Sequence, residues 1–74
     1  MSGYRIFWRT WYTRNPEYPG GCEPVPGKKH YVRGAEGYAD TEEEAHVKCK
    51  KLDAAARWTP EQRKLSAKHE YEEA

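Results

Sequence analysis

The stretch "YRIFWRTWYT", Tyr4 to Thr13, concentrates aromatic rings, an isoleucine and two arginines in a chain that is otherwise strongly polar. Strict alternation, together with the β-branched and aromatic content, predicts a strand over these residues. Both faces of such a strand carry rings, so either face could be the core. One face would carry Tyr4, Ile6, Trp8, Thr10 and Tyr12, and the other Arg5, Phe7, Arg9, Trp11 and Thr13.

The length of 74 residues predicts one small domain, spanning 1–74, with a small core. The charged fraction of 34% alone would suggest disorder, but an aromatic fraction of 14% favours a folded domain. The net charge of +1 provides no global field that would concentrate the protein on nucleic acid or an anionic membrane. With no bilayer-spanning apolar run, no export leader and only two cysteines, we expect a cytoplasmic protein with reduced thiols.

Turn-forming residues dominate the segment that follows the first strand. "RNPEYPGGCEPVPGK", residues 14–28, contains four prolines and three glycines, which predicts a long exposed loop without regular elements. The next segment, "KHYVRGAEGYA" at 29–39, predicts a second strand, a tight turn near Gly34 to Gly37, and a short third strand that carries Tyr38.

The main helix is expected from about 42 to 57, within "DTEEEAHVKCKKLDAAAR". Thr41 is the predicted N-cap, and Glu44, three residues later, completes a capping box. Glu44 and Lys48 have the spacing of a favourable ion pair on one helix face. Small side chains on the apolar stripe would let the helix lie close to the rings of a sheet. That stripe consists of Ala45, Cys49, Leu52 and Ala56.

The last segment has two patterns. "TPEQ" at 59–62 is typical of a helix start, with Thr59 as the cap and Pro60 at the first position. "KLSAKHEYE" at 64–72 then alternates as a strand does. We favour one helical turn around 60–63 followed by a strand, because another strand widens the apolar face of a small sheet. The alternative is a second helix over 60–72.

These elements predict the α+β class, with a small antiparallel sheet of three to four strands and one main helix packed on one face. If the helix covers Ile6 and Trp8, the opposite face remains uncovered. Exposed Arg and Trp are residues that carry binding energy at interfaces and that also stack on bases. The predicted partner-binding residues are Arg5, Phe7, Arg9 and Trp11, with Arg33 as a flanking charge. The alternative is that cross-strand neighbours or the proline-rich loop cover Phe7 and Trp11, which would then contribute only stability.

No catalytic, metal or nucleotide signature is present, and we expect no enzyme activity, no metal and no cofactor. Zinc sites usually contain close cysteine pairs, which are absent. Cys49 is interpreted as a small buried hydrophobic residue. The glutamates at 42–44 are explained by helix capping, and those in "EYEEA" at 70–74 by a solvated end, with mimicry of an acidic nucleic-acid backbone as the alternative. The residues that could in principle supply zinc ligands are Cys22, His30, His46 and Cys49.

Two functional classes remain. In the first, the protein is a small non-enzymatic binder that docks on another protein through the uncovered face. In the second, the same face binds single-stranded nucleic acid, and cations at Arg14, Lys28, Lys29 and Arg33 extend a basic edge. The near-neutral charge and many carboxylates favour a protein partner. A membrane partner is not expected.

The layout resembles the small orphan accessory proteins of bacteriophages and other mobile elements. The shared features are an aromatic first strand, a glycine-punctuated hairpin, "ADTEEEA" opening one helix and a short "SAKHEYEE" end. This resemblance covers most of the chain and implies a protein that docks on a host complex in the host cytoplasm and modulates or inhibits it, defence systems such as CRISPR effectors included. It carries over no individual residue.

Overall fold

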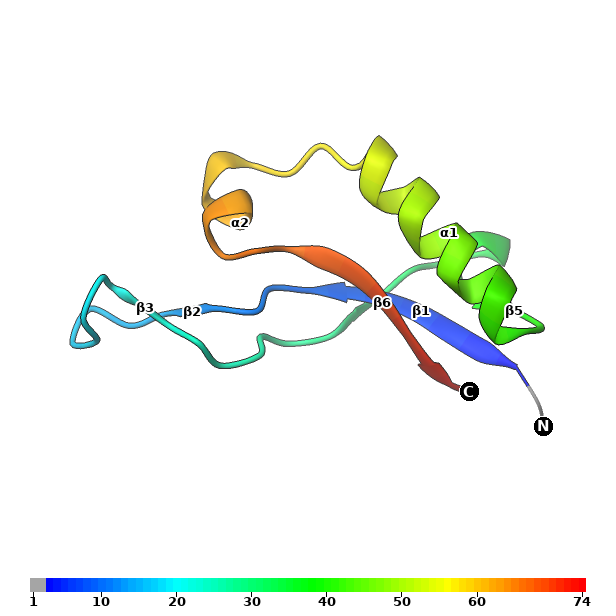
Figure 1. The fold of residues 1–74 in the computed structure, drawn as a ribbon, viewed down its shortest axis with the longest axis horizontal. Coiled ribbons are helices and arrows are strands. Elements are labelled where there is room, and N and C mark those ends of the chain that lie inside the picture. The colour runs from blue at the N-terminus through cyan, green and yellow to red at the C-terminus, as the bar shows by residue number, and fades with distance from the viewer. Residues whose placement is uncertain (1–2) are drawn as a thin grey trace.

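The computed structural model describes residues 3–74 and has the expected α+β architecture, in which a four-stranded antiparallel sheet carries the main helix on one face (Figure 1). The helix, α1, spans Glu42–Ala55 and packs mainly on the last strand. The four strands are β1 (Tyr4–Arg9), β4 (His30–Tyr31), β5 (Tyr38–Ala39) and β6 (Lys68–Glu73).

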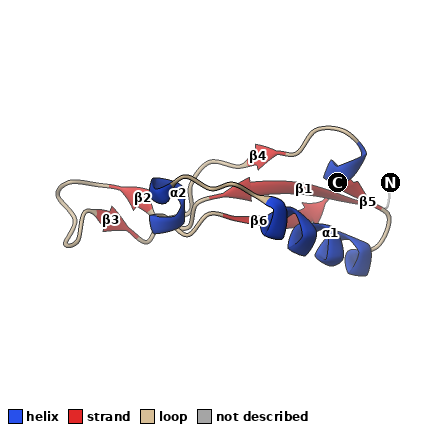
Figure 2. Cartoon of the chain, turned by 90° about the horizontal axis from the view of Figure 1, so that it is seen from above, coloured by secondary structure: helices blue, strands red, loops and turns tan. Residues whose placement is uncertain are grey.

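Strand β1 lies at the centre of this sheet. Strand β6 pairs with it along its whole length on one edge, and the short strands β4 and β5 share the other edge (Figure 2). All pairings are antiparallel, and the β1–β6 pairing places the first and last strands side by side. Residues directly opposite one another project to the same face of the sheet, and the register therefore determines which side chains meet.

The first strand is shorter than predicted. β1 ends at Arg9, because the chain bends and the backbone N–H groups of Trp11 and Tyr12 both donate to the Leu65 carbonyl, at 2.9 and 3.3 Å. Trp11 and Tyr12 therefore lie outside β1. The alternating sequence pattern that runs from Tyr4 to Thr13 does not assign these two residues to a face of the sheet.

The proline-rich segment contains a short two-stranded ribbon, so the expectation of no regular element is wrong there. Strand β2 (Thr13–Arg14) pairs with β3 (Cys22–Glu23). Gly20 and Gly21 turn the chain with φ of 87° and 79°, which only glycine adopts without strain. The ribbon extends away from the main sheet (Figure 1), and the molecule measures 42 × 24 × 18 Å along its principal axes.

The predicted turn between β4 and β5 is confirmed as the 3₁₀ turn η1, Ala35–Gly37. Gly34 has a φ of 81°. Gly37 is buried against the Val32 carbonyl, and a Cβ there would collide with it. Both glycines are thus required by the backbone path.

Helix α1 begins as predicted and ends earlier. The Thr41 hydroxyl accepts the Glu44 N–H at 3.1 Å, whereas the Glu44 carboxylate accepts from Asp40 N–H at 3.3 Å and not from Thr41 as a capping box requires. The helix ends at Ala55, before the expected residue 57, because Ala56 has extended backbone angles.

The C-terminal segment forms helix α2 (Pro60–Lys64) and then β6, which confirms the favoured prediction over a second long helix. Thr59 and Gln62 form a complete capping box, with N–H to oxygen distances of 3.1 and 2.8 Å. Among residues 3–74, neither helix is long and apolar enough to span a bilayer.

Candidate functional site

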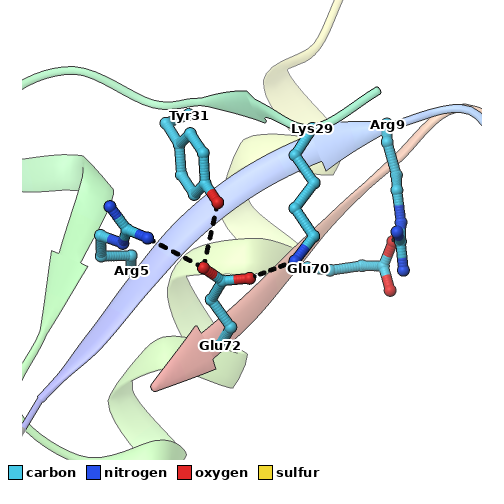
Figure 3. A network of polar contacts seen from close by, with 6 residues as sticks. All are labelled: Arg5, Arg9, Lys29, Tyr31, Glu70 and Glu72. Carbon is cyan, nitrogen blue, oxygen red and sulfur yellow. Dashed lines mark hydrogen bonds and ion pairs between the residues drawn. The ribbon is translucent and has the colours of Figure 1, made fainter. Parts of the chain in front are cut away.

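The sheet face opposite α1 is the candidate site, and we call it the helix-free face. In Figure 3 the labelled side chains lie in front of the strands and α1 lies behind them. The register assigns this face to alternate residues of the four strands: Arg5, Phe7 and Arg9 from β1, Lys68, Glu70 and Glu72 from β6, Tyr31 from β4, and Tyr38 from β5.

Phe7 is only 3% exposed, so the expectation that it is available to a partner is wrong. Three side chains lie against its ring: Tyr31 lies edge-on at 5.7 Å, and the Lys29 ammonium and Arg9 guanidinium lie 5.0 and 5.5 Å from the ring centroid. Long cationic side chains bury their apolar stems while their charged ends stay in water. For Phe7, the alternative of cover by neighbouring strands is therefore the correct one.

Glu72 is the centre of the polar network on this face (Figure 3). Its carboxylate accepts hydrogen bonds from Arg5 Nη2 at 3.0 Å, Lys29 Nζ at 2.5 Å and Tyr31 Oη at 3.0 Å. The bond from Lys29, followed by those from Tyr31 and Arg5, lowers the pKa of Glu72 below its ordinary value, against the opposing effect of partial desolvation. The network thus orients Arg5 and Tyr31 through one negative charge.

Arg9 and Trp11 are also engaged within the chain. Arg9 Nε donates to Glu70 at 3.1 Å, and its guanidinium lies 4.5 Å from the centroid of the Trp11 ring system. The Lys68 ammonium lies 5.1 Å from the same ring. Trp11 is half-buried, and its Nε1 is buried without a hydrogen-bond acceptor among residues 3–74. Both side chains therefore contribute to packing as well as to the surface.

The structure brings four of the five predicted residues together. Arg9 contacts the rings of Phe7 and Trp11, and Tyr31 links Phe7 to Arg5. Arg33 is exposed in the connection after β4 and takes no part in these contacts. It remains a separate surface charge.

Two exposed tyrosines on this face were missed by the sequence reading. Tyr31 is 45% exposed with its ring 4.4 Å from the Arg5 guanidinium carbon, and Tyr38, directly opposite Arg5 on β5, is 55% exposed. Both tyrosines belong to the segment 29–39, in which the sequence predicts two strands. Their position beside Arg5, however, depends on how β4 and β5, with two residues each, pair with β1. That pairing has no local sequence signal.

The other side of the sheet holds a cysteine, an aspartate and a histidine around one pocket of about 330 Å³. Burial, and then the charges of Asp53 and Glu70, raise the pKa of the Cys49 thiol to about 11, so the thiol is protonated and weakly nucleophilic at neutral pH. The Asp53 carboxylate accepts a hydrogen bond from the backbone N–H of His69 at 2.8 Å and lies 2.7 Å from the ring Nδ1 of the same residue. These contacts connect α1 with β6. Among residues 3–74, no three such side chains are placed to hold a metal ion.

Comparison with known proteins adds no assignment: no family model, no curated protein and no solved structure matches the chain. The geometry and charge of the helix-free face are therefore the features from which a function can be inferred.

Proposed function

We propose that the protein is a non-enzymatic binding module that docks on another protein through the helix-free face. The observation that carries this proposal is the group formed by Tyr31, Arg5 and Tyr38, in which two well-exposed tyrosines lie beside an arginine on a face without a second layer. Tyrosine and arginine are enriched at protein interfaces and among the residues that contribute most binding energy.

The ion pairs on this face favour a protein partner over single-stranded nucleic acid. Arg5 and Lys29 are paired with Glu72, and Arg9 is paired with Glu70. Affinity for nucleic acid depends on cations that are free to replace the counterions of phosphates. Carboxylates among the same cations also repel phosphates, which leaves the rings and the shape of the face as its main binding features.

The same network supports docking by holding the face in one arrangement before the partner arrives. Glu72 restrains both the Arg5 and the Tyr31 side chain through hydrogen bonds. A side chain that is already restrained loses less conformational entropy on binding, typically about 0.5–1.5 kcal/mol less for each residue. We further propose a host complex as the partner and modulation or inhibition as the outcome, following the resemblance in layout to phage accessory proteins.

Affinity capture from a bacterial lysate with matched tyrosine variants tests the proposal. Tyr38→Ala removes an exposed ring from the face, whereas Tyr18→Ala removes a ring that is 38% exposed on the distant ribbon. We expect Tyr38→Ala to weaken binding of the captured protein by about tenfold or more and Tyr18→Ala to leave it unchanged. Both variants should unfold within about 0.5 kcal/mol of the wild type.

The proposal is wrong if Tyr38→Ala retains the same proteins as the wild type. Capture of nucleic acid that is released steeply between low and moderate salt would support the second class of function instead.

A further inference from the structure

A second candidate site lies on the α1 side of the sheet. A pocket of about 370 Å³ lies between the C-terminal end of α1, the linker to α2, and the aromatic side chains of β1 and β6. Its volume is in the range of about 300–1,000 Å³ that small-molecule sites occupy, but it is shallow and open to solvent, so a ligand there would stay partly exposed. The lining residues that matter here are Trp8, Leu52, Ala55, Ala56, Arg57 and Trp58.

Two indole rings form the apolar wall of this pocket. Trp8 is stacked on His30, with ring centroids 4.3 Å apart and planes at 19°, and its centroid is 5.2 Å from that of Trp58. Trp58 in turn lies 5.4 Å from the His69 ring. These contacts hold the indoles in place, while the methyl groups of Ala55 and Ala56 leave space beside them. A planar aromatic ring is the ligand group that this wall fits best.

Arg57 is the one arginine among the described residues that line the pocket, and the Asp53 carboxylate, which does not line it, is bound to the lining residue His69. Arg57 is exposed, and in the part of the chain that the structure describes it takes part in no ion pair. The free carbonyls at the end of α1 carry about half a negative charge, so attraction for an anion would come from the Arg57 guanidinium itself and not from a positive field over the whole pocket. Guanidinium groups bind carboxylates through two parallel hydrogen bonds.

We propose that this pocket binds a small aromatic carboxylate, with the ring against the Trp8 and Trp58 indoles and the carboxylate on Arg57. This activity is separate from the proposed protein-docking face, because pocket and face lie on opposite sides of the sheet.

The three tryptophans provide a localised test with the full-length protein. Trp8 and Trp58 line the pocket, whereas Trp11 contacts Arg9 on the helix-free side. On titration with phenylacetate, we expect saturable shifts of the Trp8 and Trp58 indole N–H signals in ¹⁵N NMR spectra and none of Trp11. Phenylacetamide, which has the same ring and no charge, should bind roughly fivefold more weakly, the preference an exposed ion pair provides.

Three variants complete the test. Arg57→Gln should remove the preference for phenylacetate over phenylacetamide, and Arg63→Gln, an exposed arginine on α2 outside the pocket, should retain it. Ala55→Leu, which keeps a good helix former, should fill the space and abolish the saturable shifts. The proposal is overturned by the absence of saturable shifts in the wild type, by shifts of Trp11 in place of the other two, or by an unchanged preference in Arg57→Gln. None of these results bears on capture by the Tyr31 and Tyr38 face, so the two proposals fail independently.

Discussion

Ile6 and Phe7 are neighbours in β1 that point to opposite faces of the sheet, and both are buried, with exposures of 0% and 3%. Ile6 lies on the side that α1 covers, where the small buried residues Ala45 and Cys49 face the sheet from the helix. Phe7 lies on the side that has no second layer, beneath the side chains of Arg9, Lys29 and Tyr31. The same degree of burial is thus reached by a packed helix on one face and by amphipathic side chains on the other.

This difference has a functional consequence. A helix excludes water from the surface that it covers and removes that surface from interactions with partners. The charged ends of Arg9 and Lys29 stay at the surface, so the helix-free face shields an aromatic ring and still leaves polar groups and the exposed Tyr38 accessible from solvent. A small domain gains a second apolar contact in this way without covering the face that we propose for docking.

The largest expected effect is at the helix-covered face. Ile6→Ala should lower the free energy of unfolding by about 3–4 kcal/mol, because a packed helix cannot collapse into the cavity. Urea denaturation followed by circular dichroism measures this loss. Val47→Ala, at an exposed position of α1, is the control and should change stability by less than about 0.5 kcal/mol. A loss below about 1 kcal/mol for Ile6→Ala would show that α1 does not form a rigid cover.

The opposite face should tolerate truncation better. We expect Phe7→Ala to cost about 2 kcal/mol, less than the 3–5 kcal/mol usual for a buried phenylalanine, because the Arg9 and Lys29 side chains can move into the vacated space. The same urea titration gives the value. If Phe7→Ala destabilises as much as Ile6→Ala, side-chain cover is as rigid as helix cover and the contrast between the faces is wrong.

The smallest effect is expected from the polar network. Glu72→Gln removes the charge that pairs with Arg5 and Lys29, and exposed pairs of this kind contribute less than about 1 kcal/mol at neutral pH. The pKa of Glu72 is lowered in the folded protein, so its contribution is complete above the ordinary glutamate pKa and is lost as the pH falls through the lowered pKa. Wild type and variant should therefore converge in stability at acidic pH.

Thermal melts of both proteins between pH 7 and acid, at low and high salt, check this prediction. A difference that persists unchanged in acid would mean that Glu72 acts through packing and not through its charge.

Much of the secondary structure could be predicted because its causes are local. The Thr41 and Thr59 hydroxyls each accept the N–H three residues later, which the sequence spacing alone indicates. The end of the first strand could not be predicted, because Trp11 leaves the alternating pattern through a hydrogen bond to the distant Leu65 carbonyl. The candidate site was predicted in part: Arg5 lies on the helix-free face as expected, whereas Phe7 is buried.

Glu70 and Glu72 show why the remainder of the site was out of reach. Their spacing of two residues indicates a strand, but nothing in "EYEEA" specifies that they face Phe7 and Arg5, as the β6 register places them. The register depends on β1 and on how α1 packs over both strands.

The sequence by itself determined the helix caps, the turns at glycine and the class of fold, because these depend on groups a few residues apart. Only the tertiary structure decided which rings are buried and which cations are free. The Arg5 to Glu72 ion pair joins residues 67 positions apart, and the exposure of each side chain depends on whichever distant segments fold against it.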